Sequence, residues 1–356
     1  NMKKNIIFCS GGTGGHIFPA ISMINYFKDK SNVILVTDKR ALKYIPSTEC
    51  EIKVFNVSSF SKKKIFSNIF SLIKLFVTFL YSIYFILKKR TDIVFGFGGY
   101  VSFSILLAAK FLNRTIYLYE PNLVLGRTNR LFVNSCRKIF TTSNNIINIP
   151  KKNLSKFIEV GPIIRNEIIK FSREEKTLNN DEKTIIILGG SQGARIFGEI
   201  IPVAISTFCK NNFKIKVVQQ VITNQIKKIE NFYNEHNIQC KIFDFDSNIA
   251  ELISKSDLAI SRSGSSTIAE LEFLQVPFIA IPYPFAMDNH QYENALYYKS
   301  KNTCWILEQK NFTSNNLSLL LLEIFNNNND LKVKRKKMFY DRKTNTLDKI
   351  KKEILI

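Results

Sequence analysis

The chain has 356 residues, which is longer than one hydrophobic core usually supports and therefore predicts two domains. Hydrophobic residues make up 45% and charged residues 22%, a composition that excludes a disordered chain. The formal net charge of +22 suits an anionic partner such as a membrane surface or nucleic acid, but the lysines are spread so widely that the charge is weak evidence for either.

A short apolar strand is predicted at residues 5–9, and the glycine-rich loop SGGTGGH at residues 10–16 follows it directly. Four glycines within five positions let a backbone approach a ligand closely, which is typical of phosphate-binding loops, although the Lys-Ser/Thr pair of a Walker A motif is missing. Pro19 stands near the start of the helix that we expect next. The pattern predicts a βα unit with a candidate phosphate loop.

His16 is the one side chain in this loop whose pKa lies near neutrality in its unperturbed form. A lone histidine is more often structural than catalytic, so the residue by itself leaves both interpretations open. As a catalytic group it would be a general base beside a bound sugar phosphate.

Residues 65–87 form an apolar run that is long enough to span a bilayer. Its polar residues are spaced to form one narrow stripe along a helix, and basic residues flank both ends, which gives no positive-inside asymmetry. A spanning helix would also divide a repeating βα domain in two. We therefore predict a packing helix that covers the sheet and meets a membrane surface through its apolar and basic parts.

The rest of the first half alternates between apolar runs and turns. The string FGGYVS at residues 97–102 repeats the strand-then-glycine pattern, and Glu120-Pro121-Asn122 ends a later strand. Strands are predicted at residues 33–36, 92–95, 116–119 and 138–141. This alternation of strands and helices predicts an α/β domain with a parallel sheet.

A Gly-Pro pair within residues 160–166 indicates the crossing into a second domain. Residues 184–188 read as a strand buried on both faces, and the loop GGSQGAR at residues 189–195 opens a helix whose N-terminus would favour a phosphate. Strands at residues 215–218 and 241–243 continue the pattern. At the end of the chain we expect a polar loop at 326–329 and a solvated terminal helix at 332–352.

Residues 258–281 contain a strand, the turn Ser261–Gly264, a helix and a second strand. Such βα turns bind phosphorylated ligands. Thr267 and Glu270 fit a capping box, in which each side chain would satisfy the other's backbone N–H, and spacing alone favours that interpretation. The alternative is that Glu270 faces the vicinal hydroxyls of a bound sugar.

The strings GGTGGH, GGYVS, GGSQGAR and RSG…DNHQ together resemble those of the family 28 glycosyltransferases over nearly the whole chain. The resemblance implies a GT-B fold, in which two Rossmann-like, doubly wound parallel-sheet domains face a cleft. Residues 1–162 would be the acceptor- and membrane-facing domain and 163–340 the UDP-sugar domain, with a C-terminal helix in 341–356 returning to the first. The implied reaction is an inverting transfer of N-acetylglucosamine from UDP-N-acetylglucosamine to the muramyl 4-hydroxyl of lipid I, which forms lipid II.

The resemblance also implies roles for individual residues. His16 would be the catalytic base, Arg165 (otherwise a solvated linker charge) would lie near the donor diphosphate, and Glu270 would hold the donor. Three positions depart from the family pattern: Phe103 replaces a glycine, and Pro121 and His290 replace glutamines. The implied substrate-binding residues are Thr13, Gly14, Gly15, Asn122, Arg165, Ser191, Asp246, Ser265, Ser266, Thr267, Ile268, Ala269, Glu270 and Gln291.

The predicted partners are UDP-N-acetylglucosamine, lipid I and an anionic membrane surface that residues 65–87 and their basic neighbours contact; nucleic acid is not among them. The protein would be peripheral, on the cytoplasmic face of the bacterial inner membrane. No DxD-like metal pair or His/Cys cluster occurs in the site loops, so no cofactor and no obligatory metal are expected. The alternatives are another lipid glycosyltransferase such as a diacylglycerol glucosyltransferase, a UDP-sugar epimerase, and a non-catalytic membrane-bound scaffold.

Overall fold

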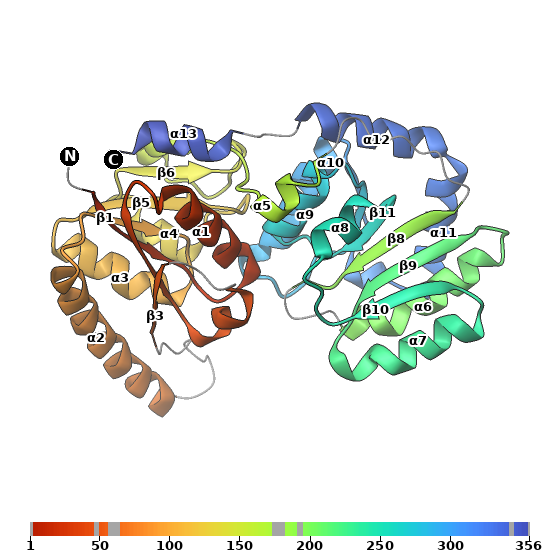
Figure 1. The fold of residues 1–356 in the computed structure, drawn as a ribbon, viewed down its shortest axis with the longest axis horizontal. Helices are drawn as coiled ribbons and strands as arrows, with labels where there is room; N and C mark the ends of the chain where they lie inside the picture. The colour runs from red at the N-terminus through yellow and green to blue at the C-terminus, as the bar shows by residue number, and fades with distance from the viewer. Residues whose placement is uncertain are drawn as a thin grey trace. The chain divides into compact units, whose positions relative to one another are not determined.

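The computed structural model describes residues 3–45, 50–55, 65–172, 182–190, 195–341 and 345–354 (Figure 1). The chain divides into two units, the first comprising Asn1–Ile163 with Thr344–Ile356 and the second Ile164–Lys343. Each unit holds one parallel sheet between helices, as the alternating pattern of the sequence predicts.

The sheet of the first unit has seven strands in the order β3-β2-β1-β4-β5-β6-β7, all paired in parallel. Strands β2 and β3 therefore extend the sheet on one side of β1. The chain then crosses to the other side of β1, where β4 to β7 follow one another in order. The strands are β1 (Asn5–Cys9), β2 (Asn32–Thr37), β3 (Glu51–Val54), β4 (Ile93–Gly96), β5 (Thr115–Glu120), β6 (Lys138–Thr141) and β7 (Phe157–Glu159).

Alternate side chains of this sheet enter two hydrophobic layers. Ile6 and Phe8 of β1 face a core that includes the apolar side of α1 and Ile350 of α13, whereas Gly96 lies against Leu106 of α3 on the other face. The helix α2 packs mainly on α3 rather than on the sheet itself. The helices are α1 (Gly14–Phe27), α2 (Ile65–Lys88), α3 (Tyr100–Phe111), α4 (Arg127–Phe132) and α13 (Thr346–Glu353), with 3₁₀ turns η1 (Lys39–Tyr44) and η2 (Lys151–Lys156).

The sheet of the second unit has six strands in the order β10-β9-β8-β11-β12-β13, again all parallel. Ile185 and Ile187 of β8 face α6, α7 and α11, while Ile186 and Leu188 face α8, α9 and α10. The side chains of β8 form a continuous apolar run because helices cover both faces of the sheet at this strand. The strands are β8 (Lys183–Leu188), β9 (Ile215–Gln220), β10 (Gln239–Phe243), β11 (Leu258–Ser261), β12 (Phe278–Ala280) and β13 (Cys304–Ile306).

The helices of the second unit follow the strands in alternation. They are α5 (Asn166–Ile169), α6 (Arg195–Cys209), α7 (Ile226–Glu235), α8 (Ile249–Ser254), α9 (Ser265–Phe273), α10 (His290–Ser300), α11 (Ser314–Asn326) and α12 (Asn328–Asp341), with 3₁₀ turns η3 (Thr223–Gln225), η4 (Met287–Asn289) and η5 (Gln309–Asn311).

Three local predictions are wrong. Pro19 lies inside α1, which begins at Gly14, because the glycines themselves form the first turn. The polar stretch 326–329 is not a loop, since only Asn327 separates α11 from α12. The terminal helix is two helices, and the first is not simply solvated: Arg335 of α12 is 2% exposed and its Nη2 donates to the Asp257 carbonyl at 3.0 Å.

Candidate active site

In both units the strand order reverses beside the first strand of the sheet, between β1 and β4 and between β8 and β11. Such a reversal leaves a crevice at the carboxyl ends of the two strands, where open α/β sheets bind ligands. The loops that follow these four strands carry the glycine-rich strings that the sequence singled out. The fold thus provides one candidate ligand site in each unit.

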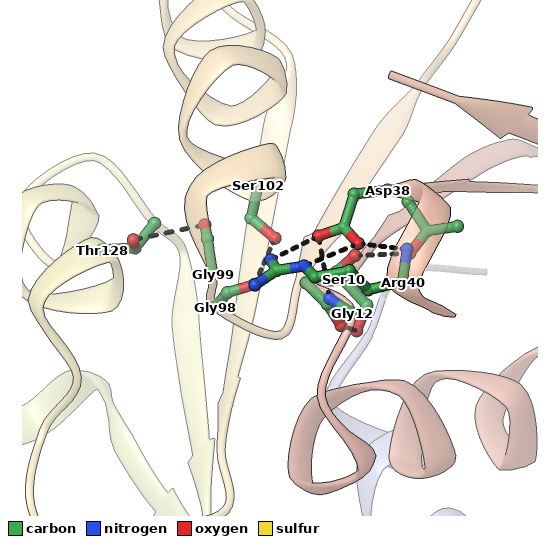
Figure 2. A network of polar contacts seen from close by, with 10 residues as sticks. Ser10, Gly12, Asp38, Arg40, Gly98, Gly99, Ser102 and Thr128 are labelled. Atoms are coloured by element: carbon green, nitrogen blue, oxygen red, sulfur yellow. Dashed lines mark hydrogen bonds and ion pairs between the residues drawn. The ribbon is translucent and has the colours of Figure 1, made fainter. Parts of the chain in front are cut away.

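In the first glycine loop, the backbone N–H groups of Gly11 and Gly12 donate hydrogen bonds to other residues of the protein. Gly11 N donates to the Gly98 carbonyl at 3.0 Å, and Gly12 N donates to the Asp38 carboxylate at 3.1 Å (Figure 2). The phosphate-loop interpretation therefore does not extend to these two N–H groups. Thr13, Gly14 and Gly15, which the sequence predicted as ligand contacts, form the N-cap and first two residues of α1, where an anion would be favoured.

His16 is the third residue of α1, and its half-buried ring lies against Gly98 of the β4 loop. A Cβ atom on Gly98 would come within 3.2 Å of His16 Cε1 and 3.4 Å of Nδ1, so the missing side chain is what lets the ring lie there. The glycines of the two loops thus serve close packing around the candidate base.

We expect replacement of Gly99, in the loop after β4, to lower the stability of the protein substantially. The φ of Gly99 is +86°, and an added Cβ would lie 2.7 Å from Gly11 Cα. We expect Gly99→Ala to lower the free energy of unfolding by about 2–5 kcal/mol, from left-handed strain plus overpacking. Gly190→Ala is the matched control, since Gly190 has φ +82° but no neighbour within 4 Å among the described residues. Urea unfolding would compare them; equal losses would contradict the packing role of Gly99.

Glu120, at the end of β5, organises the loop that contains Asn122. The carboxylate is buried and accepts hydrogen bonds from Asn122 N at 3.1 Å, Asn122 Nδ2 at 3.2 Å, Gly126 N at 2.8 Å and Asn129 Nδ2 at 2.9 Å. The predicted contact residue Asn122 is therefore fixed by its own neighbour. Pro121, which replaces the family's glutamine, leaves this network intact because no bond in it needs a side chain at 121.

Burial raises the pKa of the Glu120 carboxyl above its ordinary value of 4.5, although four N–H donors oppose the shift. The native state then binds the proton more tightly than the unfolded state, so this group's contribution to stability falls as pH rises. We expect the stability of the native sequence relative to Glu120→Gln to decrease as pH rises above 4.5, until the carboxyl is ionised in both states. Urea unfolding at a series of pH values measures this difference; a flat profile would contradict it.

In the second unit, Arg165 and Glu270 form a bidentate ion pair. Arg165 Nε and Nη2 each lie 2.6 Å from one carboxylate oxygen of Glu270, and the two side chains are 20% and 7% exposed. Burial alone would lower the pKa of Arg165, but the charge of Glu270 and its hydrogen bonds hold it above the ordinary value. The interpretation of Arg165 as a solvated linker charge is wrong.

The capping box is also wrong. The N-cap of α9 is Gly264, so Thr267 already lies inside the helix, and no side chain caps it. Glu270 points its carboxylate at Arg165 instead of at the helix start. The predicted contacts Ser265, Ser266, Thr267, Ile268 and Ala269 occupy the first five positions of α9.

Arg262 lies in the loop of the candidate site after β11, and the sequence did not single it out as a contact residue. It follows β11 directly, is 8% exposed, and donates to Ile281 O at 3.1 Å and to Gln309 Oε1 at 2.7 Å. Burial lowers its pKa to about 10, and no described carboxylate forms an ion pair with it. A charged residue at the end of an otherwise buried strand was the signal available in the sequence.

Arg262 also supports the turn that holds Gln291. Its guanidinium carbon lies 5.4 Å from the centre of the Tyr283 ring, and Tyr283 N donates to Gln291 Oε1 at 3.0 Å. His290 beside it contacts Met287 O through Nδ1 at 2.8 Å. Asp246 lies in the loop after β10, where it pairs with Lys241 at 2.6 Å. Ser191 lies outside the described residues.

Phe103, the remaining departure from the family pattern, is in α3, and its ring lies 5.7 Å from that of Phe132 in α4. The larger side chain therefore has a packing partner in the neighbouring helix.

Two family models match the chain. The glycosyltransferase family 28 N-terminal domain matches residues 6–141, and the glycosyltransferase family 28 C-terminal domain matches residues 184–354. A protein of Pelagibacter ubique (strain HTCC1062) named UDP-N-acetylglucosamine--N-acetylmuramyl-(pentapeptide) pyrophosphoryl-undecaprenol N-acetylglucosamine transferase is 36% identical over 354 residues, which cover 99% of this chain and 98% of the relative. A Rickettsia felis (strain ATCC VR-1525 / URRWXCal2) protein of the same name is 34% identical and covers 91% of both chains.

Solved structures agree on the fold. The crystal structure of Acinetobacter baumannii MurG is similar with a TM-score of 0.79 at 21% identity, covering 99% of each chain. A UDP-GlcNAc 2-epimerase from Neisseria meningitidis, solved with UDP-GlcNAc bound, is similar with a TM-score of 0.66 at 15% identity, also over 99% of each chain. At these identities the likeness concerns the fold alone.

Proposed function

Because the chain belongs to glycosyltransferase family 28 and has the two doubly wound units of the GT-B class, we propose that it transfers N-acetylglucosamine from UDP-N-acetylglucosamine to the muramyl 4-hydroxyl of lipid I. The product would be lipid II, a precursor of peptidoglycan. The observation that carries this proposal is the 36% identity over 99% of the chain to a transferase of that name.

The second unit would bind the donor. Glu270 is the sixth residue of α9 and is buried, and its carboxylate would accept hydrogen bonds from the two ribose hydroxyls of UDP while Arg165 holds it in place. The buried cation Arg262 and the N-terminus of α9 would favour the diphosphate. Gln291 would meet the sugar through its amide N–H groups, because its oxygen already accepts from Tyr283 N.

In the transfer step, His16 would take the proton from the attacking 4-hydroxyl as that oxygen displaces UDP from the anomeric carbon, with inversion. The leaving diphosphate gains negative charge in the transition state. Fixed cations and backbone N–H groups stabilise such charge without reorganising. Arg262, which has no carboxylate partner among the described residues, can therefore supply positive charge that other transferases take from a metal ion, and we expect transfer to proceed with a chelator present.

A transfer assay tests this function. Purified protein receives radiolabelled UDP-N-acetylglucosamine and a chelator, with or without a short-chain lipid I analogue. Label moving to the lipid only when the muramyl acceptor is present supports the proposal. Transfer to diacylglycerol instead would favour another lipid glycosyltransferase, and donor binding without transfer to either acceptor would contradict the proposed activity.

We further propose that α2 docks the first unit on the cytoplasmic face of an anionic bacterial membrane. Its exposed apolar residues recur at helical spacing and share one face: Ile73, Phe76, Val77, Leu80, Tyr84 and Leu87 are each 49–60% exposed. Two polar residues of the helix turn inward: Thr78 is half-buried, and Ser82 is buried with its hydroxyl donating to Thr78 O. An apolar outward face with Lys88, Lys89 and Arg90 at one end suits a lipid surface with anionic headgroups.

Among the described residues, no helix is both long and apolar enough to cross a membrane.

Leu80→Glu should weaken membrane binding. The leucine is 49% exposed on the apolar face, and losing the burial of such a side chain corresponds to about a 10- to 100-fold lower affinity. Cosedimentation with vesicles that contain anionic lipid measures the change. Leu319→Glu is the matched control, because Leu319 is 56% exposed on the second unit. Equal loss in both variants, or no loss in either, would contradict docking through α2.

A further inference from the structure

A buried carboxylate holds the glycine loop from which α1 presents His16. Asp38 follows β2 and is 5% exposed; its Oδ2 accepts from Gly12 N at 3.1 Å and from Arg40 Nη2 at 2.7 Å (Figure 2). Its Oδ1 accepts from Arg40 N at 2.9 Å and Arg40 Nε at 3.1 Å. Four donors thus fix both oxygens of one side chain.

Only glycine fits beside this carboxylate. A Cβ on Gly12 would lie 2.2 Å from Asp38 Oδ1 and 2.8 Å from Arg40 Cβ. The neighbouring residues continue the attachment to the end of β2, since Ser10 N donates to Val36 O at 3.1 Å and Thr37 Oγ1 donates to Ser10 O at 2.8 Å. The glycine at position 12 and the hydrogen bonds of Ser10 thus together hold the loop against the end of β2 and Asp38.

The other side of the loop is tied to β4. Ser102 Oγ lies 2.8 Å from Cys9 O and 2.7 Å from Gly98 O, and Gly11 N donates to that same Gly98 carbonyl (Figure 2). Gly98 is also the residue against which the His16 ring lies. The loop before α1 is thus held between the segments that follow β2 and β4. The His16 ring lies against the second of these segments, at Gly98.

We propose that Asp38, held by Arg40, is a positioning residue for the transfer reaction: its bond to Gly12 sets the start of α1 and so the place of the His16 ring. The role of His16 in turn rests on the proposed function. Because a displacement of about 1 Å at a reacting group can cost roughly 100-fold in rate, loss of this bond should act on turnover rather than on donor binding.

The negative charge of Asp38 strengthens its hydrogen bond to Gly12 N. Burial would raise the pKa of the Asp38 carboxyl, but hydrogen bonds from Arg40 and its charge, together with Gly12 N, hold that pKa below its ordinary value. The carboxylate therefore stays ionised at neutral pH, and its bond to Gly12 is charge-assisted. Asparagine at this position keeps the shape and loses the charge and one acceptor oxygen.

The test compares Asp38→Asn and Arg40→Gln with Asp92→Asn. Asp92 lies at the opposite end of the same sheet, where its Oδ2 also accepts one backbone N–H, from Asn5 at 2.9 Å. The chain has three histidines, so protein labelled with ¹³C at histidine Cε1 has three signals to resolve, and the signal lost in His16→Gln is that of His16.

We expect both loop variants to shift or broaden the His16 signal while the signals of His236 and His290 stay in place. They should lower kcat by about 10- to 100-fold with KM for the donor within about twofold. Asp92→Asn should change neither readout. An unmoved His16 signal in folded Asp38→Asn or Arg40→Gln would overturn the proposal, as would equal effects of Asp92→Asn. Arg40 has a 59% exposed side chain, so its variant remains informative if Asp38→Asn fails to fold.

The NMR readout does not depend on activity. If the native sequence transfers no sugar, the proposed function fails, while the histidine signals still decide whether Asp38 positions the ring.

Discussion

Replacing His16 with alanine should lower kcat by about 10²- to 10⁴-fold, the usual contribution of a general base, and leave donor affinity within about twofold. The ring stands at the start of α1 in the first unit, against Gly98, whereas Arg165, Glu270 and Arg262 belong to the second. Removing the imidazole therefore removes the proton acceptor without touching the residues proposed to hold UDP.

The measurement is steady-state transfer to the lipid I analogue, together with calorimetric titration of UDP. His236→Ala is the control, because His236 is an exposed residue at the end of α7 whose ring stacks on Phe232 at 4.2 Å. An equal loss of turnover and donor affinity in His16→Ala would contradict a base role, since it would assign the histidine to binding.

Replacing Glu270 with alanine should have two effects that can be separated. It leaves the guanidinium of Arg165 largely buried without its partner, which is expected to cost about 3–5 kcal/mol of stability. It also removes the proposed acceptor for two ribose hydroxyls. At about 1.5–3 kcal/mol for each hydrogen bond to a charged group, UDP affinity should fall by about 100-fold or more.

The double variant Arg165→Met/Glu270→Leu separates stability from binding. Replacing both members of a buried pair by apolar residues of similar volume is often near neutral, so we expect its stability to return to within about 1–2 kcal/mol of the native sequence while UDP affinity stays low. Urea unfolding and calorimetric titration give the two quantities. Recovery of UDP binding in the double variant would show that the carboxylate is not a donor ligand and acts only as the partner of Arg165.

The sequence predicted the interior strands because both faces of a parallel sheet are covered. Residues 138–141 coincide with β6, and 184–188 fall one residue short of β8. The strands β3, β7 and β13 were not predicted. Each is three or four residues long and lies at the edge of its sheet, where one neighbour suffices and polar residues such as Glu51 and Lys53 of β3 are tolerated.

The helix at residues 65–87 was predicted from its length and composition, and α2 spans Ile65–Lys88. Periodicity also marked its polar stripe, but it could not say which face turns toward the protein. The structure buries Ser82 together with Phe85 and Ile86 on one face and exposes Phe76 and Leu80 on another. The contacts of α2 with α3 decide which face of α2 turns inward. Because α3 is a separate segment later in the chain, the periodicity of residues 65–87 cannot indicate these contacts.

The sequence by itself determined the doubly wound fold, the positions of the glycine loops and the family, because apolar runs and turn residues act over a few neighbouring positions. Only the tertiary structure decided what the charged residues do. Glu270 meets Arg165 across 105 positions, and Gly12 meets Asp38 across 26. Spacing favoured a local partner for Glu270, and it did not indicate that Asp38, whose other donors come from nearby Arg40, would also bind Gly12 N. A buried carboxylate takes whichever donors the packed sheets bring within about 3 Å, and local periodicity carries no record of that approach.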